Sequence, residues 1–482
     1  MFVKSVGATG AASGLAGCIG GEENGNGADE ELTEETDVDA EIELQVTTNS
    51  DIADESDAVR EMLWENGLSE DVFPHLVEVG EVTDDMEAEY RSWLAAGRST
   101  PDLLIADSGW TIPLIVRDQL VNLEEELPGE LVSEIHEEYF EMSVESAVHP
   151  ETGELYAVPL YPDFPTIQYR KDLVEDAGYD PDGEEWATNP LSWAEFSAVV
   201  ADTLESHDDV EYGYTWQAPP SEQLSCCVFN EMITSWGGAY FGGPDNLYGP
   251  VGDRPVTVDE EPVIDALRMG RTLIRGEDDE FAMDAIEGIS PDAVVQWDVE
   301  PSRAPFTDGD AVAHRNWPYS IAINGADDVH GEDMGVMPLP YGVPEDEATY
   351  DGTGGSTAAL GGWHYAVNPN TEYLDACLSF LEAMATEEFM LDLFELVGYI
   401  PPKPEIVNSE EAAETEVMGR YVETLQYAGE HAMPRPVTVL WPEQSNRIEQ
   451  QVSDVLAGDL DPGPAMDELR ETLASLEAEG QE

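Results

Sequence analysis

Asp107 is the first residue whose position suggests chemistry, because it directly follows a short apolar run. Residues 101–107 read Pro-Asp-Leu-Leu-Ile-Ala-Asp, a composition typical of a buried strand that ends at a carboxylate. In open α/β sheets, ligands collect just beyond the carboxyl ends of the strands, which favours a binding role for Asp107. The structural alternative is that Asp107 caps the helix that follows the strand.

Motifs of common enzymes and metal sites are missing from the sequence. The chain has no G-x-x-x-x-G-K-[S/T] phosphate loop, no H-E-x-x-H and no G-x-S-x-G. The acidic cluster at 180–184 lacks calcium-loop spacing, and the histidines show no pairing typical of metal ligands. We therefore expect no catalytic residue, no metal and no cofactor. A glycoside hydrolase stays open, since it needs only two carboxylates and the chain has 105 acidic residues.

The composition excludes several classes of partner. The 482 residues favour two or three domains, and the 41% of hydrophobic residues, with 11 Trp and 18 Tyr, can build a large core. Lys and Arg number only 18 against 105 acids, a net charge of -87, so we exclude nucleic acids and charge-driven binding to anionic membranes.

An acidic surface of this kind repels itself at ordinary ionic strength. At molar salt the Debye length falls to roughly 3 Å, which screens this self-repulsion. The dispersed acidity thus indicates a salt-adapted protein, as from a halophilic archaeon.

The N-terminus carries a predicted export signal. Residues 1–17 are rich in small residues and end in Leu15-Ala16-Gly17 before Cys18, which resembles a lipobox. We predict that Cys18 receives lipid after cleavage and that residues 18–40, rich in Gly, Asn and acids, form a flexible tether. The soft signal resembles the twin-arginine type, although the arginine pair is missing, so the export route stays open. No run of about 18 apolar residues predicts a membrane span.

The remaining cysteines are Cys226, Cys227 and Cys377. Adjacent cysteines bridge only with strain, and no spacing suggests a metal site. We interpret all three as small buried residues on helices, with the redox state of the adjacent pair left open.

Strand-like and helix-like patterns alternate from residue 41 onward, which predicts an α/β fold. Residues 42–46 alternate at period two, as in a strand, whereas 83–96 carry an apolar stripe at helical spacing. Ser192 and Glu195 are spaced as a capping box that opens a helix running through Leu204.

A series of motifs, taken in their order along the chain, resembles the extracellular solute-binding proteins of sugar ABC transporters. Within this family the motifs are most similar to the trehalose/maltose branch. The similarity runs from about 42 to 471 and includes the capping-box helix and residues 308–319, which end in Arg-Asn-Trp-Pro-Tyr. The other matching segments are Pro101-Asp102, Gly153-x-x-Tyr-x-x-Pro159, Tyr169-Arg-Lys-Asp-Leu173, 334–340, 361–368, Gly398-Tyr-Ile-Pro401, Arg435-Pro436, Trp441 and Ser445.

The resemblance implies a two-lobed, periplasmic-binding-protein-like fold of type II, whose chain crosses the hinge three times. It also implies a sugar bound between the lobes, delivery to the transmembrane subunits of a permease, and a separate ATPase. We expect a monomer that is anchored outside the membrane by lipid alone. The N-terminal lobe is expected at 41–161 plus 363–398, and the C-terminal lobe at 164–357 plus 400–482, with crossings near 161–164, 357–362 and 399–402.

The resemblance also assigns candidate ligand-binding residues, and their chemistry suits a neutral sugar. Carboxylates and Arg hydrogen-bond to hydroxyls, and aromatic rings cover the apolar faces of the sugar. By this match Asp107 and Asp163 accept from hydroxyls, Arg435 donates, and Gly362 lets the backbone come close. The aromatic residues expected to stack are Trp317, Tyr319 and Trp363.

Each candidate has a structural alternative. The tryptophans could be core residues at strand ends, and Arg435 could simply neutralise a neighbouring carboxylate. Pro162 and Pro165 around Asp163, and the adjacent cysteines, depart from the family pattern, so the identity of the sugar stays open between maltose, trehalose and other glycosides. The alternatives for function are an anchored or secreted glycoside hydrolase and a binding protein for a different solute.

Overall fold

The computed structural model describes residues 40–79 and 83–480. Within these residues strands and helices alternate, so the predicted α/β class is confirmed. The predicted signal at 1–17, the lipidation residue Cys18 and the tether up to residue 39 lie outside the described residues. In the described part, no helix is long and apolar enough to span a bilayer.

The strands of the described residues form two sheets. The first has the order β10-β9-β3-β1-β2, and β4 also pairs with β9. Its strands are β1 (Ile42–Thr48), β2 (Val72–Glu78), β3 (Leu103–Asp107), β4 (Ala157–Asp163), β9 (Ala358–Val367) and β10 (Ala432–Pro434). The second has the order β6-β7-β5-β8. Its strands are β5 (Thr166–Arg170), β6 (Tyr212–Thr215), β7 (Ala311–Asn316) and β8 (Met334–Met337).

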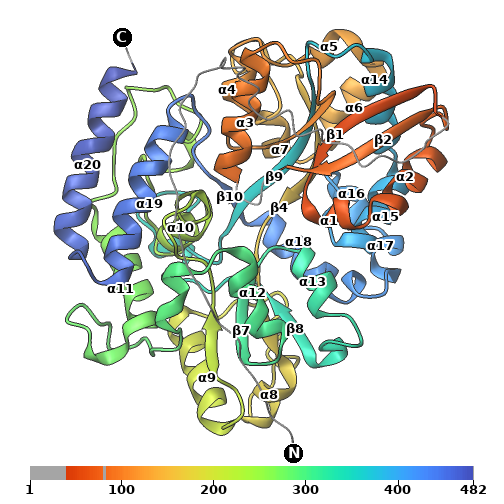
Figure 1. Cartoon of the computed structure of the whole chain (residues 1–482). Helices are drawn as coiled ribbons and strands as arrows, with labels where there is room; N and C mark the ends of the chain where they lie inside the picture. The colour runs from red at the N-terminus through yellow and green to blue at the C-terminus, as the bar shows by residue number, and fades with distance from the viewer. Residues whose placement is uncertain (1–39, 80–82, 481–482) are drawn as a thin grey trace, which may run out of the picture. The chain divides into compact units, whose positions relative to one another are not determined.

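Helices surround both sheets, and short 3-10 turns join several of them (Figure 1). Their bounds are α1 (Ser50–Asp54), α2 (Ser56–Glu65), α3 (Thr83–Ala95), α4 (Thr111–Ile115), α5 (Leu123–Glu126), α6 (Gly129–Glu138), α7 (Glu141–Glu145), α8 (Lys171–Asp176), α9 (Trp193–Ser206), α10 (Phe229–Ser235), α11 (Glu261–Arg275), α12 (Val299–Thr307), α13 (Tyr319–Asn324), α14 (Leu374–Met384), α15 (Glu387–Val397), α16 (Pro404–Val407), α17 (Glu410–Glu414), α18 (Val422–Glu430), α19 (Trp441–Ala457) and α20 (Pro462–Glu479). A π-helical turn, η1 (Gln223–Val228), precedes α10.

The buried apolar side chains gather in two clusters, one around each sheet. The first draws on residues 44–161 and 365–406 and includes Tyr90 and Trp110. The second draws on residues 164–360 and 394–473 and includes Trp216 and Trp441. Strand β9 is long enough to touch both clusters, since its first residues belong to the second cluster and its last ones to the first.

Local sequence patterns predicted the elements that carry them. The strand expected at 42–46 is β1, and the helix expected at 83–96 is α3. The Ser192 hydroxyl accepts from the Glu195 N–H while the Glu195 carboxylate accepts from the Ser192 N–H, so the capping box at the start of α9 is confirmed.

Candidate functional site

Strands β3 and β4 end close to Trp363, which lies in the middle of β9. Strands β3 and β4 flank β9, and the register pairs Trp363 with Asp107 on one side and with Tyr161 on the other. Directly paired residues of antiparallel strands point to the same face of a sheet, so these three side chains share a face. Asp107 ends β3, as the sequence predicted, yet it caps no helix, because the N-cap of α4 is Trp110. Instead, its Oδ1 accepts from the N–H of Gly109 at 2.6 Å.

Arg435 lies between two carboxylates beside this strand end. It follows β10, which pairs with the start of β9. Its Nη2 is 2.9 Å from Asp107 Oδ1, and its Nη1 donates to Glu222 Oε1 at 2.7 Å. The side chains are buried, with Arg435 only 3% exposed and Asp107 7%. Burial opposes the charged form of the guanidinium, but the two carboxylates outweigh it and raise the pKa of Arg435.

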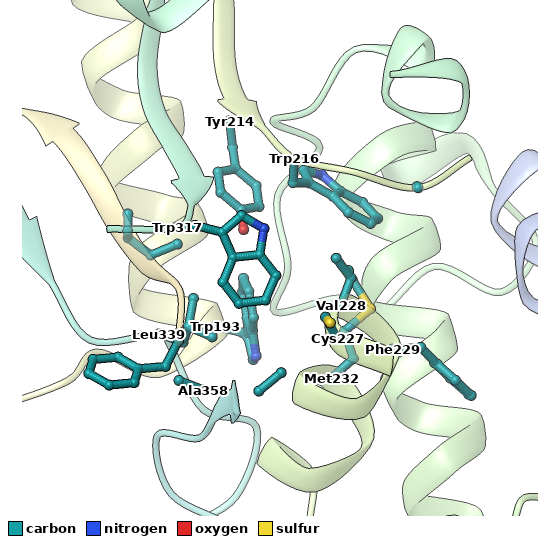
Figure 2. Close-up of a cluster of buried hydrophobic side chains, with 14 of the residues drawn as sticks. Trp193, Tyr214, Trp216, Cys227, Val228, Phe229, Met232, Trp317, Leu339 and Ala358 are labelled. Atoms are coloured by element: carbon teal, nitrogen blue, oxygen red, sulfur yellow. The ribbon is translucent and has the colours of Figure 1, made fainter. Parts of the chain in front are cut away.

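Trp317 and Arg435 both lie close to Gly361. Trp317 follows β7, is 6% exposed and packs in the second apolar cluster with Trp193, Tyr214 and Cys227 (Figure 2). A Cβ added to Gly361 would lie 3.6 Å from Arg435 Nη2 and 3.9 Å from Trp317 Cη2. The absence of a side chain at Gly361 therefore leaves the space where the guanidinium and the indole approach each other.

A second buried arginine lies over the indole of Trp317. The Cζ atom of Arg315 is 4.7 Å from the ring centroid. Arg315 Nε donates to Glu231 Oε2 at 3.0 Å, and its Nη1 donates to Gln217 Oε1 at 2.8 Å. The guanidinium is thus both paired and hydrogen-bonded, which is what a charge away from water requires. It also covers part of the Trp317 ring system.

Asp163 and Asp51 are two further carboxyl groups of this region, and burial raises the pKa of both. Asp163 ends β4, opposite Gly361, and burial raises its pKa well above the usual range, with Arg315 opposing the shift. Burial raises the pKa of Asp51 to about 6, although Tyr399, whose hydroxyl donates to Asp51 Oδ2 at 3.0 Å, lowers it. Both groups hold their protons more tightly than exposed aspartates do.

Two tyrosines stack where β4 meets the segment after α15. The rings of Tyr161 and Tyr399 lie 3.8 Å apart, centroid to centroid, with planes inclined by 25°. Asn49 Nδ2 donates to the Tyr161 hydroxyl at 2.9 Å.

Tyr319 begins α13 and donates its hydroxyl to Glu300, which also pairs with Arg303. These two charges also act on Asp51: the negative charge of Glu300 raises the pKa of Asp51, and the positive charge of Arg303 lowers it.

The structure brings most of the predicted residues together. The strand register places Trp363 beside Asp107, and Arg435 forms an ion pair with Asp107. Gly362 lies next to this pair, since the Ser108 N–H donates to Gly362 O at 2.9 Å. Trp317 and Asp163 join them at Gly361, where a Cβ would lie 3.6 Å from Asp163 O. For Tyr319, by contrast, the nearest recorded partners are Glu300 and Asn316 rather than the other candidates.

Sequence reasoning missed several residues of this group, which are Asp51, Glu222, Glu231 and Arg315, and it considered Tyr161 and Tyr399 only as hinge residues. Glu222 and Glu231 carry no local signal that separates them from the many other acids of the chain. Arg315 directly precedes Asn316 and Trp317 in a quoted motif, so its proximity to the indole was the signal that could have identified it.

The sequence left the redox state of the adjacent cysteines open, and the structure shows them oxidised. Cys226 and Cys227 are buried on a helix, as predicted, but a disulfide joins them. The pair lies in the π-helical turn η1. Cys377 is unbonded and buried, as predicted. In the described part of the chain, no group of His, Cys, Asp and Glu could hold a metal ion.

Two surface hollows of the described residues lie away from this group. One of about 450 Å³ is lined by Arg447, Glu468 and Thr472, and another of about 440 Å³ by Arg170, Asp308 and His330. Neither lining includes Asp107, Arg435 or a tryptophan, so the site rests on its converging side chains rather than on either hollow.

Comparison with known proteins identifies the family of the chain. The profile described as bacterial extracellular solute-binding protein matches residues 75–419, most of the chain. The chain belongs to this family. Solved structures agree on the fold, which is that of two-lobed α/β solute-binding proteins: maltose-bound MalE3 of T. maritima matches with a TM-score of 0.74 at 22% identity, over 90% of this chain and 100% of that one.

Two further relatives of this solute-binding protein cover similar lengths. The GacH receptor of Streptomyces glaucescens, solved unliganded and with acarbose, matches with a TM-score of 0.69 at 18% identity, over 90% of this chain and 98% of that one. A protein of Deinococcus radiodurans named a probable ABC transporter-binding protein is 25% identical over 419 residues, which are 84% of this chain and 87% of the relative.

Proposed function

We propose that this solute-binding protein captures a neutral sugar, of the maltose or trehalose type, for an ABC importer. The observation that carries the proposal is that Arg435 pairs with Asp107 and also lies, with Trp317, beside Gly361. A carboxylate and a guanidinium supply charge-assisted hydrogen bonds for hydroxyls, and the indole supplies an apolar surface for ring C–H groups. Trp363, only partly buried beside Asp107, adds a second indole.

The charges of the site favour a neutral ligand over an anion. Arg435 is already paired with Asp107 and Glu222, and Arg315 is paired with Glu231. An anionic ligand would have to compete with these buried carboxylates for the guanidinium groups, and the remaining excess of negative charge would repel it. A sugar can instead share the hydrogen bonds without displacing the ion pairs.

We propose that the two apolar clusters are the cores of the two lobes, with lobe bounds of 41–161 plus 363–398 and 164–357 plus 400–482. The change of cluster near residue 161, and again along β9 and near 399, supports this division. Asp107 and Trp363 then belong to one lobe, and Trp317 and Arg435 to the other. In this proposal the two lobes close over the sugar by a hinge motion, and the bound sugar stabilises the closed form.

The transport role rests on the family and on the named relative from Deinococcus. In this proposal the protein is held outside the membrane by lipid on Cys18, acts as a monomer in concentrated salt, and delivers the sugar to the transmembrane subunits of a permease. Asp163 and Tyr319 complete the proposed ligand-binding set.

The test is a panel of sugars added to the protein in molar KCl, scored by the melting temperature. A ligand at about 100 times its Kd stabilises the native state by about 2.7 kcal/mol, an easily measured shift. We expect maltose or trehalose to raise the melting temperature and glycerol at the same concentration to leave it unchanged. No shift with any sugar of the panel would contradict the proposal.

A glycoside hydrolase is the second candidate, because Asp51 and Asp163 have raised pKa values, as a general acid requires. The same incubation separates the two functions. A binding protein returns maltose intact after hours, whereas a hydrolase releases glucose. We expect intact maltose by chromatography, and stoichiometric glucose that disappears in an Asp163→Asn variant would establish the hydrolase instead.

A further inference from the structure

Two buried glutamates lie at the ends of residues 222–231, a segment made of η1 and the first turn of α10. Glu222 Oε1 accepts from Arg435 Nη1 at 2.7 Å, and Glu231 Oε2 accepts from Arg315 Nε at 3.0 Å. Glu231 is 5% exposed and Glu222 9%. One short segment therefore supplies a counter-charge to both arginines of the proposed site.

Each of these arginines touches a residue of the proposed ligand set. Arg435 also donates to Asp107, and Arg315 lies over the ring of Trp317. The chain of contacts thus runs from Glu222 through Arg435 to Asp107, and from Glu231 through Arg315 to Trp317. Neither glutamate needs to touch the sugar to influence how it binds.

Further hydrogen bonds hold this segment against the strands that carry the site. Asn230 Nδ2 donates to the carbonyls of Met433 and Pro434, both at 3.3 Å, directly before Arg435. Glu231 Oε1 also accepts from the Ala359 N–H in β9 at 3.3 Å. The Tyr240 hydroxyl donates to Ser225 O at 2.5 Å. The segment is therefore fixed relative to β9 and β10, as a positioning element must be.

From this arrangement we infer that Glu222 and Glu231 are positioning residues of the sugar site, an inference that rests on the proposed function. With Glu222 present, the guanidinium of Arg435 is shared between two carboxylates, and Asp107 keeps acceptor capacity for sugar hydroxyls. Without the charge of Glu222, Arg435 pairs with Asp107 alone and both groups are withdrawn from the ligand. Loss of the Glu231 charge releases Arg315 from its place over the indole.

The experiment measures sugar affinity by calorimetry in molar KCl for Glu222→Gln and Glu231→Gln, which keep the side-chain shape and remove the charge. We expect each variant to lose on the order of 10-fold in affinity, a size typical of coupled residues. The matched control is Asp279→Asn, since Asp279 pairs with buried Arg271 at 2.9 Å in another part of the chain. It should lower stability to denaturant and leave the affinity unchanged.

A double-mutant cycle separates positioning from a general structural role. If Glu222 acts through Arg435, then Glu222→Gln combined with Arg435→Gln loses no more affinity than Arg435→Gln alone. Additive losses, or wild-type affinity in both single variants, would overturn the inference while leaving the sugar-binding function intact. A wild-type protein that binds no sugar of the panel would instead overturn the proposed function, and the positioning role with it.

Discussion

At the scale of single residues, the site depends on buried arginine and aspartate side chains, whose charge depends on burial and on their hydrogen-bonding partners. Arg435 and Arg315 keep their charges because each has a carboxylate within hydrogen-bonding distance. Asp51 differs, because its carboxyl group accepts a hydrogen bond from the neutral Tyr399 hydroxyl, and burial raises its pKa to about 6. The region therefore combines permanent ion pairs with a carboxyl group that titrates in an accessible pH range.

Trp317→Ala should abolish sugar binding, since the indole supplies an apolar surface at Gly361. We expect an affinity loss of at least about 100-fold, as for a buried Trp at the centre of an interface. The cavity should also cost about 3–5 kcal/mol of stability, because Trp317 is almost fully buried. Calorimetry and denaturant unfolding measure the two effects.

Trp317→Phe is the companion variant, because it keeps an aromatic ring and much of the packing. It should fold and bind with a smaller loss than Trp317→Ala. Wild-type affinity in a folded Trp317→Ala variant would show that the indole does not contact the sugar.

Asp51 predicts a pH dependence of stability. Its folded pKa, about 6, lies above the ordinary aspartate value of 3.8, so the folded state binds the proton more tightly than the unfolded state. The contribution of Asp51 to stability is therefore greatest at low pH and is lost as the pH rises from about 4 to about 6. Asp51→Asn cannot titrate and lacks this loss. Unfolding by denaturant in molar KCl should show the variant gaining on the wild type across this interval; parallel profiles would contradict the assignment.

At the scale of elements, the sequence predicted what is encoded locally. The capping box of α9 and strand β1 follow from residues a few positions apart. The end of β3 at Asp107 was predicted for the same reason. The pairing of Arg435 with Glu222 joins residues 213 positions apart, and no local pattern encodes which of many acids such an arginine meets. The family resemblance supplied Arg435 and Trp317, but not the glutamates that hold the arginines.

The disulfide of η1 predicts a response to reduction. Cys226 and Cys227 lie between Glu222 and Glu231, about one helical turn from each, and both are buried in the cluster that contains Trp317 (Figure 2). We expect that opening the bond lets the two sulfurs repack and loosens residues 222–231. We expect a reductant such as TCEP to lower sugar affinity roughly 3- to 10-fold, within the usual range for coupled neighbours.

The control for this prediction is a variant with both Cys226→Ser and Cys227→Ser. It should bind sugar weakly and show no further response to the reductant, which also tests whether buried Cys377 contributes. Equal affinity of the oxidised and reduced wild-type protein would show that the disulfide has no influence on the site.

At the scale of the whole molecule, charge governs the conditions for folding. A net charge of -87 on 482 residues makes self-repulsion strong when the Debye length is about 10 Å, near 0.1 M salt. At about 1 M salt the Debye length is about 3 Å, shorter than most distances between surface charges. The ion pairs of the site are buried and are screened much less, so salt acts mainly on the surface.

The melting temperature should therefore rise by several degrees as KCl increases from about 0.1 M to about 2 M. NaCl should act similarly, because screening depends on ionic strength, whereas sucrose at the same osmolality should give a smaller increase. A melting temperature that falls or stays constant with KCl would contradict salt adaptation.

The central claim is that a sugar binds where Asp107, Arg435 and Trp317 meet and leaves chemically unaltered. Its most direct test is a crystal structure of the protein with the disaccharide that gives the largest melting shift. We predict an intact disaccharide against the indoles of Trp317 and Trp363, with hydroxyls within hydrogen-bonding distance of Asp107 and Arg435. A disaccharide bound elsewhere, with both indoles enclosed in the protein and away from it, would contradict the account.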